Sequence, residues 1–181
     1  MHVHLFRRLL NVFLRGIAAA SPALIVLAAD VRAAPAPIEI VAIGASNTSG
    51  LGVHPQNAYP ARLQAMLKEK GYNVRFTNAG MILDTTAGML RRIDAAVPDG
   101  TRIVILQPGG NDLRFFGTRQ RRAANIEAMV ARLRSRKIEV IVFDPEIPQQ
   151  YYQFDGIHIT AKGHAWFAAK LLPQVMAALT R

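Results

Sequence analysis

IEIVAIGASN, residues 38–47, is an apolar, β-branched run that stops at a glycine and is followed by a serine. Near-continuous apolar strands are typical of a parallel sheet that is covered on both faces. Later stretches of the same character lie at residues 73–77, 102–107 and 138–143. We therefore expect a buried strand at each of these positions.

Helical patterns separate the expected strands. They cover residues 61–70, 85–97, 119–137 and 161–179, and the last of them contains Pro173. Strands that alternate with helices form right-handed βαβ units and a mostly parallel sheet. The sequence therefore predicts an α/β fold with three layers, α/β/α, and about four to five strands.

The first 33 residues differ from the rest of the chain. A basic start precedes an apolar stretch at residues 16–29, which ends in small residues before Ala33. This layout is typical of a secretory signal peptide. We expect cleavage after Ala33, a linker at residues 34–37, a single domain at residues 38–181 and a periplasmic or secreted protein. An uncleaved anchor helix is the alternative, but the apolar stretch is short for a membrane span.

Composition narrows the function classes. The chain has no cysteine, which excludes disulfides, thiolate metal sites and a cysteine nucleophile. Its net charge is +10, and residues 119–137 hold much of the excess. These arginines fit a solvated helix face, and they also make an anionic membrane or cell-envelope surface a candidate partner. No interleaved aromatic pattern indicates nucleic acid, and no pattern indicates an obligate protein partner.

The loops that follow the expected strands are the place to look for a site. Ligands of open parallel sheets bind beyond the carboxyl ends of the strands. The corresponding loops are residues 44–52, 78–84, 108–112 and 144–158, and all are polar or contain glycine. We therefore expect the functional residues in these four segments.

Two of these loops carry candidate chemistry besides a serine. Asp155 and His158 are close enough in sequence for the carboxylate to orient the imidazole ring. The alternative is a helix start, with Thr160 or Asp155 as the cap. Asn111 follows two glycines, so its amide is a candidate donor to an oxyanion, although a simple turn would use the same residues.

Ser46 is the candidate nucleophile. A serine at a strand-to-helix turn exposes its hydroxyl next to the positive end of the helix. The Gly-x-Ser-x-Gly elbow of α/β-hydrolases is not matched, because Thr48 replaces the second glycine. Walker and Gly-x-Gly-x-x-Gly nucleotide loops are absent from the sequence. A loop that binds a flavin phosphate stays open as an alternative.

Taken together, the motifs resemble the SGNH (GDSL-type) hydrolase superfamily, from about Ile38 to Leu179. The blocks that carry the resemblance are Ser46 after the first strand, the segment 78–88, Gly-Gly-Asn-Asp at 109–112 and Asp-x-x-His at 155–158. The resemblance implies a flavodoxin-like SGNH-hydrolase fold and a serine esterase that needs no metal or cofactor.

The resemblance also implies roles for individual residues. Ser46, His158 and Asp155 would form the catalytic triad. The oxyanion hole would take the N–H of Ser46, the N–H of Leu83 or Gly80, and the Asn111 amide. The candidates for substrate binding are Asn47, Gly110, Leu113, Phe115 and Tyr152. Phe116 and Tyr151 also flank the expected site, and packing is the alternative role for the apolar and aromatic members of this set.

The sequence departs from the family pattern at three places. Ala45 stands where the family has aspartate, and Leu83 stands where it has glycine. The stretch between Asn111 and Asp155 is short, so a late strand and helix are expected to be missing. Short acyl esters, lysophospholipids, thioesters or acetylated sugars are the implied small-molecule substrates. The alternative function is a weakly active or inactive binder of acyl or glycan ligands on the same fold.

Overall fold

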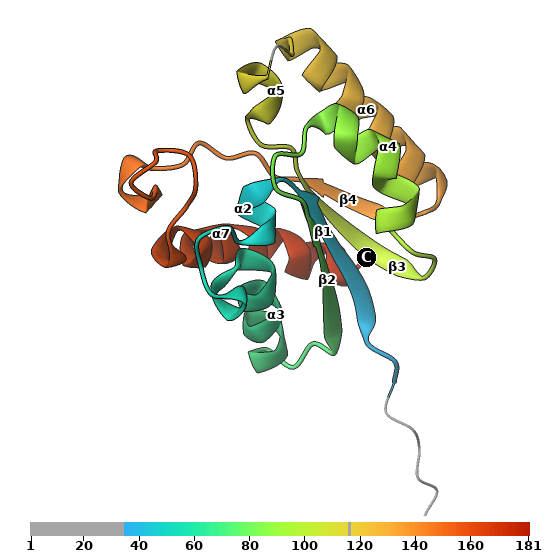
Figure 1. Cartoon of the computed structure of the whole chain (residues 1–181). Helices are drawn as coiled ribbons and strands as arrows, with labels where there is room; N and C mark the ends of the chain where they lie inside the picture. Colours follow the sequence, from blue (N-terminus) through green and yellow to red (C-terminus); the bar gives the residue numbers. More distant parts are fainter. Residues whose placement is uncertain (1–34, 116) are drawn as a thin grey trace, which may run out of the picture. The chain divides into compact units, whose positions relative to one another are not determined.

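The computed structural model describes residues 35–181 except residue 116. The expected signal peptide therefore lies outside the described residues. Four parallel strands form one sheet in the order β2-β1-β3-β4 (Figure 1). The strands are β1 (Ile38–Gly44), β2 (Val74–Gly80), β3 (Thr101–Gln107) and β4 (Glu139–Val142).

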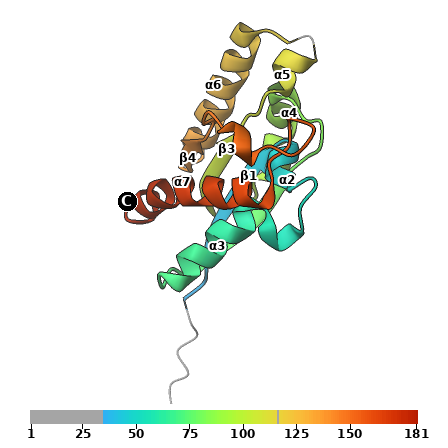
Figure 2. The ribbon, with the colours of Figure 1, turned by 90° about the vertical axis from the view of Figure 1, so that its left-hand side faces the viewer.

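Two pairs of long helices cover the two faces of the sheet (Figures 1 and 2). One core contains residues of α3 (Tyr59–Glu69) and α7 (Ala161–Leu179). The other contains residues of α4 (Thr86–Ala96) and α6 (Arg119–Ser135). Shorter elements are α2 (Ser46–Ser49), α5 (Asn111–Arg114) and the 3-10 turns η1 (Pro55–Asn57) and η2 (Gln149–Tyr151). The predicted three-layer α/β/α fold is confirmed.

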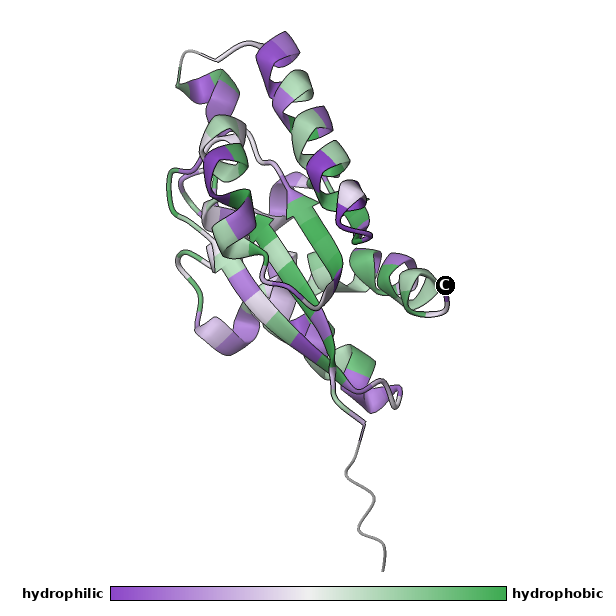
Figure 3. Ribbon diagram, turned by 90° about the vertical axis from the view of Figure 1, so that its right-hand side faces the viewer, coloured by the Kyte–Doolittle hydropathy of each residue, from purple (hydrophilic) through white to green (hydrophobic). Residues whose placement is uncertain are grey.

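The central strand explains why the two faces are equally apolar. Along β1, Ile40 and Ala42 point into the core under α3 and α7, whereas Val41 and Ile43 point into the core under α4 and α6. All four side chains are buried, because alternate residues of a strand face opposite sides. Figure 3 shows the resulting continuous apolar character of the inner strands.

The two edge strands differ from the expectation in opposite directions. β2 extends to Gly80 rather than ending near residue 77, because its last residues keep parallel pairing with β1 as far as Gly44. β4 has only four residues and is followed by an irregular segment that leads directly to α7. A fifth strand is absent from the described part of the chain, in agreement with the short spacing noted in the sequence. Within that part, no helix has the length and apolar character needed to span a membrane.

Candidate functional site

Ser46 lies at the carboxyl end of β1, as the first residue of α2, and is 6% exposed. The turn requires close contact at Gly44, where a Cβ atom would overlap Thr48 Oγ1 and lie 2.7 Å from the Gln107 carbonyl oxygen. Thr48 Oγ1 donates to Gln107 Oε1 at 3.1 Å and lies 3.2 Å from the Tyr59 hydroxyl. These buried contacts hold α2 against the sheet and fix the position of the Ser46 side chain.

Ser46, His158 and Asp155 form a continuous hydrogen-bonded chain. Ser46 Oγ lies 3.0 Å from His158 Nε2, and His158 Nδ1 lies 2.5 Å from Asp155 Oδ2. In the neutral imidazole, Nδ1–H donates to the carboxylate and Nε2 accepts from the serine hydroxyl. The structure therefore brings Ser46 to the Asp155–His158 pair, which lies more than 100 positions later in the sequence.

Asp155 is held in its ionised form by its own loop. The backbone N–H groups of His158 and Ile157 each donate to Asp155 Oδ1 at 2.9 Å. The hydrogen bonds from the His158 backbone and side chain, together with that from Ile157, lower the pKa of Asp155 to about 2. Thr160, rather than Asp155, caps α7 by accepting from the Gly163 N–H. Asp155 therefore remains a carboxylate over the whole physiological pH range.

The loop that carries His158 is attached to the nucleophile helix by Asn47. Asn47 Nδ2 donates to the Ile157 carbonyl at 3.2 Å, and the Ile159 N–H donates to Asn47 Oδ1 at 3.0 Å. The amide thus binds the backbone on both sides of His158. Asn47 also lines the cleft beside Ser46, and its expected role in substrate binding stays a prediction.

Three of the four expected oxyanion-hole donors keep an N–H that makes no hydrogen bond within the described residues, and their role stays a prediction. The Ser46 N–H is at the first turn of α2, where a helix leaves backbone donors free. The Leu83 N–H makes no hydrogen bond within residues 35–115 and 117–181. The Gly80 N–H instead donates to Asn78 Oδ1 at 3.0 Å, so it is occupied and Leu83 is the better candidate of the two. Asn111 Nδ2 donates to the Asp84 carbonyl at 2.8 Å, which ties this amide to the Leu83 loop.

Leu83 adopts a backbone conformation that usually requires glycine. Its φ is +62°, in the left-handed region, and 67% of the residue is exposed. The loop thus keeps the shape that a glycine would give it, at a cost of roughly 1–2 kcal/mol for a side chain with Cβ. The direction of the Leu83 N–H is therefore set by this backbone conformation rather than by the leucine side chain.

Two buried carboxylates, Asp84 and Asp112, hold the loops around the site. Both lie in blocks that carry the family resemblance, but the sequence analysis gave neither of them a role. Arg92 Nε donates to Asp84 Oδ2 at 2.8 Å, and Arg92 Nη2 donates to the carbonyls of Gly44 and Ala79. The Asp112 carboxylate accepts from the N–H and hydroxyl of Thr86. Arg92 carries no motif signal, but an arginine placed two turns after Asp84 in the sequence is compatible with such a pair.

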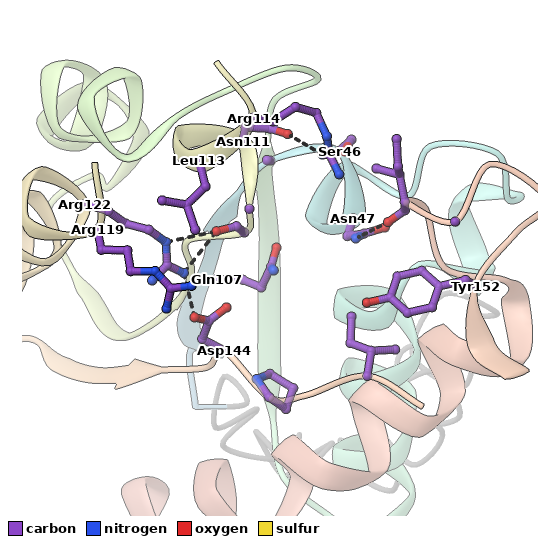
Figure 4. Close-up of a pocket in the computed structure, with 17 residues that line it drawn as sticks. Ser46, Asn47, Gln107, Asn111, Leu113, Arg114, Arg119, Arg122, Asp144 and Tyr152 are labelled. Carbon is purple, nitrogen blue, oxygen red and sulfur yellow. Dashed lines mark hydrogen bonds and ion pairs between the residues drawn. The ribbon is translucent and has the colours of Figure 1, made fainter. Parts of the chain in front are cut away.

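The cleft beside Ser46 has a volume of about 400 Å³. Gly110, Leu113 and Tyr152 line it, as the sequence led us to expect. Leu113 and Tyr152 are labelled in Figure 4. Phe115 is 45% exposed and does not line the cleft. Phe116 lies outside the described residues. The cleft also contains Arg119, which the sequence analysis did not connect with the site.

The remaining histidines have structural positions. His54 Nδ1 accepts from the Gln56 N–H at the start of η1. His164 is completely buried, and its Nδ1 accepts from the Tyr59 N–H at 3.2 Å. Within the described ranges, no cluster of three or more His, Asp or Glu side chains is arranged to hold a metal ion.

Comparison with known proteins adds an independent line of evidence. The family model for GDSL-like lipases and acylhydrolases matches residues 42–149. The esterase TesA of Pseudomonas aeruginosa is 30% identical over 114 residues, which are 62% of this chain and 56% of that protein. The chain thus spans little more than half the length of this relative.

Solved structures show the same fold. A TesA crystal structure superposes with a TM-score of 0.72 at 21% identity, over 77% of this chain and 99% of the other. AlinE4, described as an esterase of the SGNH-hydrolase family, gives 0.61 at 25% identity, over 81% and 99%. EstA, an esterase from Pseudoalteromonas sp., gives 0.69 at 15% identity, over 79% and 99%.

Proposed function

Because the chain belongs to the GDSL-like lipase/acylhydrolase family, we propose that it is a serine esterase that uses Ser46, His158 and Asp155. The observation that carries the proposal is the hydrogen-bonded chain from Ser46 Oγ to the imidazole at 3.0 Å and from the imidazole to the carboxylate at 2.5 Å. Nucleophile, base and orienting acid are all within hydrogen-bonding reach.

The reaction proceeds in two halves. Ser46 Oγ attacks the ester carbonyl carbon while His158 Nε2 takes the hydroxyl proton. The resulting imidazolium is stabilised by Asp155 and then gives its proton to the leaving alcohol. Water, activated by the same imidazole, hydrolyses the acyl-enzyme and regenerates Ser46.

The tetrahedral intermediates carry negative charge on the former carbonyl oxygen. The N–H groups of Ser46 and Leu83 and the free N–H of the Asn111 amide are the proposed donors to this oxygen. One such donor contributes about 3 kcal/mol to transition-state stabilisation. The left-handed backbone at Leu83 keeps its donor available although the glycine of the family pattern is missing.

The proposed substrates are carboxylic esters with a short acyl group. A cleft of about 400 Å³ accommodates only a small substrate. Lysophospholipids, thioesters and acetylated sugars are the further classes that the family resemblance implies. The expected signal peptide makes the periplasm or the cell exterior the proposed location.

Hydrolysis of p-nitrophenyl acetate and butyrate, combined with active-site labelling, tests the proposal. Ser46→Ala should lower kcat/KM by about 10⁴-fold or more, as for other triad serines. Ser49→Ala is the matched control, since Ser49 lies on the same helix and its hydroxyl only donates to the Ser46 carbonyl. A fluorophosphonate should label Ser46 in the wild type and nothing in Ser46→Ala.

Activity that survives Ser46→Ala, or a label on another residue, would overturn the assignment. A wild-type protein that neither hydrolyses esters nor reacts with the probe would favour the alternative, a binder of acyl or glycan ligands. Such a protein should still show a ligand-dependent rise in melting temperature.

A further inference from the structure

The cleft beside Ser46 is rich in arginine. Arg114, Arg119 and Arg122 all line it, and Asp144 is the one carboxylate among its lining residues in the described part of the chain (Figure 4). Figure 4 shows Arg119, Arg122 and Asp144 together on one side of the cleft, with Tyr152 on the other. An excess of positive charge next to the nucleophile favours the binding of esters that carry negative charge.

Arg122 has structural partners that account for its charge. Its Nη2 donates to Asp144 Oδ2 at 2.6 Å, and its Nε and Nη2 donate to the Gly109 carbonyl at 3.1 and 3.0 Å. The arginine thus joins α6 to the loops that follow β3 and β4. Asp144 neutralises Arg122, so this pair adds no net charge to the cleft.

Arg119 and Arg114 have no such compensation. Neither forms an ion pair with a carboxylate of residues 35–115 or 117–181. Arg114 Nη1 makes one long hydrogen bond, of 3.4 Å, to Asn111 Oδ1. Two guanidinium groups therefore present free donors to whatever occupies the cleft.

The position of Arg119 is also unfavourable for the helix that carries it. Helix N-termini favour acidic residues because the backbone there is positive. The first four residues of α6 are instead Arg119, Gln120, Arg121 and Arg122, and the first turn has no acidic residue. A local arrangement that opposes helix stability is expected where function requires it.

We infer that the site takes an ester that carries a second, anionic group, a carboxylate or a phosphate, which Arg119 and Arg114 bind. The inference rests on the proposed esterase function and specifies its substrate class. Guanidinium groups bind such anions through paired, charge-assisted hydrogen bonds. The anion lies in the part of the cleft that Arg119 and Arg114 line, while the ester carbonyl lies at Ser46.

Two pairs of synthetic esters test the inference and distinguish an anion on the acyl group from an anion on the leaving group. 4-Nitrophenyl hydrogen adipate and 4-nitrophenyl hexanoate differ in one acyl-chain terminus, a carboxylate or a methyl group. 4-Acetoxybenzoate and 4-acetoxybenzamide differ in the charge of the leaving phenol. In at least one pair, the kcat/KM of the wild type for the anionic ester should exceed that for the neutral ester by about tenfold at low salt.

Variants separate local binding from general charge. Arg119→Gln and Arg114→Gln should each lower the anionic-to-neutral ratio of kcat/KM by about threefold, because the two side chains share the tenfold preference of the wild type. Arg121→Gln is the matched control, because it removes the same charge from an exposed position of α6 that does not line the cleft. It should leave the ratio unchanged. Arg119→Glu should reverse the preference.

The outcomes separate the inference from the esterase proposal. A wild type that hydrolyses neutral esters through Ser46 but shows no anionic preference in either pair overturns the inference alone. Equal effects of Arg119→Gln and Arg121→Gln also overturn it, since they would indicate only the field of the whole helix. If no ester is hydrolysed, titration calorimetry of Ser46→Ala with monomethyl adipate and methyl hexanoate decides: tighter binding of the anion, lost in Arg119→Gln, supports the inference, and equal binding overturns it.

Discussion

The two halves of the candidate site are built differently. Ser46 and Asn111 follow the central strands β1 and β3 and are 6% and 7% exposed. Asp155 and His158 lie on the irregular segment between β4 and α7, where the Asp155 side chain is 41% exposed. The contacts that anchor the first half include the buried Arg92–Asp84 ion pair, whereas the Asn47 amide attaches the second half to α2. Damage to the first should therefore reduce stability most, and damage to the second should reduce activity most.

Arg92→Met should have the largest effect and should appear in stability. Arg92 joins the buried Asp84 carboxylate to the carbonyls at the ends of β1 and β2. Without the guanidinium the carboxylate is buried and unpaired, so the free energy of unfolding should fall by about 3 kcal/mol. Urea denaturation at neutral pH measures the change.

Arg132→Met is the control for that prediction. Arg132 pairs with Asp94, but both side chains are more than half exposed, so the loss should be below about 1 kcal/mol. Equal losses of unfolding free energy in the two variants would show that the half of the site that follows β1 and β3 does not depend on the contact between Arg92 and Asp84.

Asn47→Ala tests the other half. It removes both hydrogen bonds that hold the backbone beside His158, so the imidazole should lose its alignment with Ser46. We expect kcat for p-nitrophenyl butyrate to fall by about 100-fold, the usual effect of a displacement near 1 Å. The loss of stability should be only about 1–2 kcal/mol.

Asn57→Ala provides the matched comparison for Asn47→Ala. Asn57 Oδ1 accepts from Arg62 Nη2 at 2.7 Å, away from the cleft. This variant should lose comparable stability and keep its kcat. If both variants kept full kcat, Asn47 would not be what aligns His158.

His164 of α7 accepts a hydrogen bond from Tyr59 at the start of α3. Because this histidine is buried, we expect the stability of the protein to depend on pH. Burial, and secondarily the charge of Arg62, lower the pKa of His164 to about 4. An unfolded histidine has a pKa of about 6.5, so on acidification the unfolded chain takes up a proton first. Stability is therefore full above about pH 6.5 and falls as the pH drops toward 4, by about 2 kcal/mol between pH 7 and pH 5.

Denaturation curves of His164→Gln and His54→Gln check the pH effect. The first variant should flatten the pH dependence in this range, whereas the second should retain it, because His54 is exposed. A slope that persists in His164→Gln would assign the effect to other groups.

Much of the site could be predicted from the sequence because its candidate catalytic residues lie in the loops that follow the strands. The glycine before Ser46, the two glycines before Asn111 and the short spacing of Asp155 and His158 each leave a local pattern. A parallel sheet then brings such loops to one edge, whatever their distance in sequence.

The contacts that hold these residues could not be predicted in the same way. Asn47 forms a hydrogen bond with the backbone of Ile157, 110 residues away. Because every residue has a backbone carbonyl, the side chain at position 157 gives no sign of this contact. Arg92 lies within a helix and has no distinctive neighbours. The left-handed backbone at Leu83 could not be predicted from the sequence either, because glycine is the residue that usually indicates this conformation.

The smallest expected effect separates the backbone of Leu83 from its side chain. Leu83 and Lys137, with φ of 62° and 60°, are the two non-glycine residues of the described chain with positive φ, and Lys137 is remote from the cleft. Leu83→Gly and Lys137→Gly should each raise the free energy of unfolding by up to about 1 kcal/mol, because glycine removes the strain but adds entropy to the unfolded chain. Urea denaturation measures both gains.

Activity then distinguishes the two glycine variants. If only the N–H at position 83 acts on the oxyanion, Leu83→Gly keeps the kcat of the wild type, as Lys137→Gly does. A tenfold fall in Leu83→Gly alone would mean that the exposed leucine side chain contributes to binding or to excluding water. In that case the departure from the family glycine would be a functional feature of this chain rather than a tolerated strain.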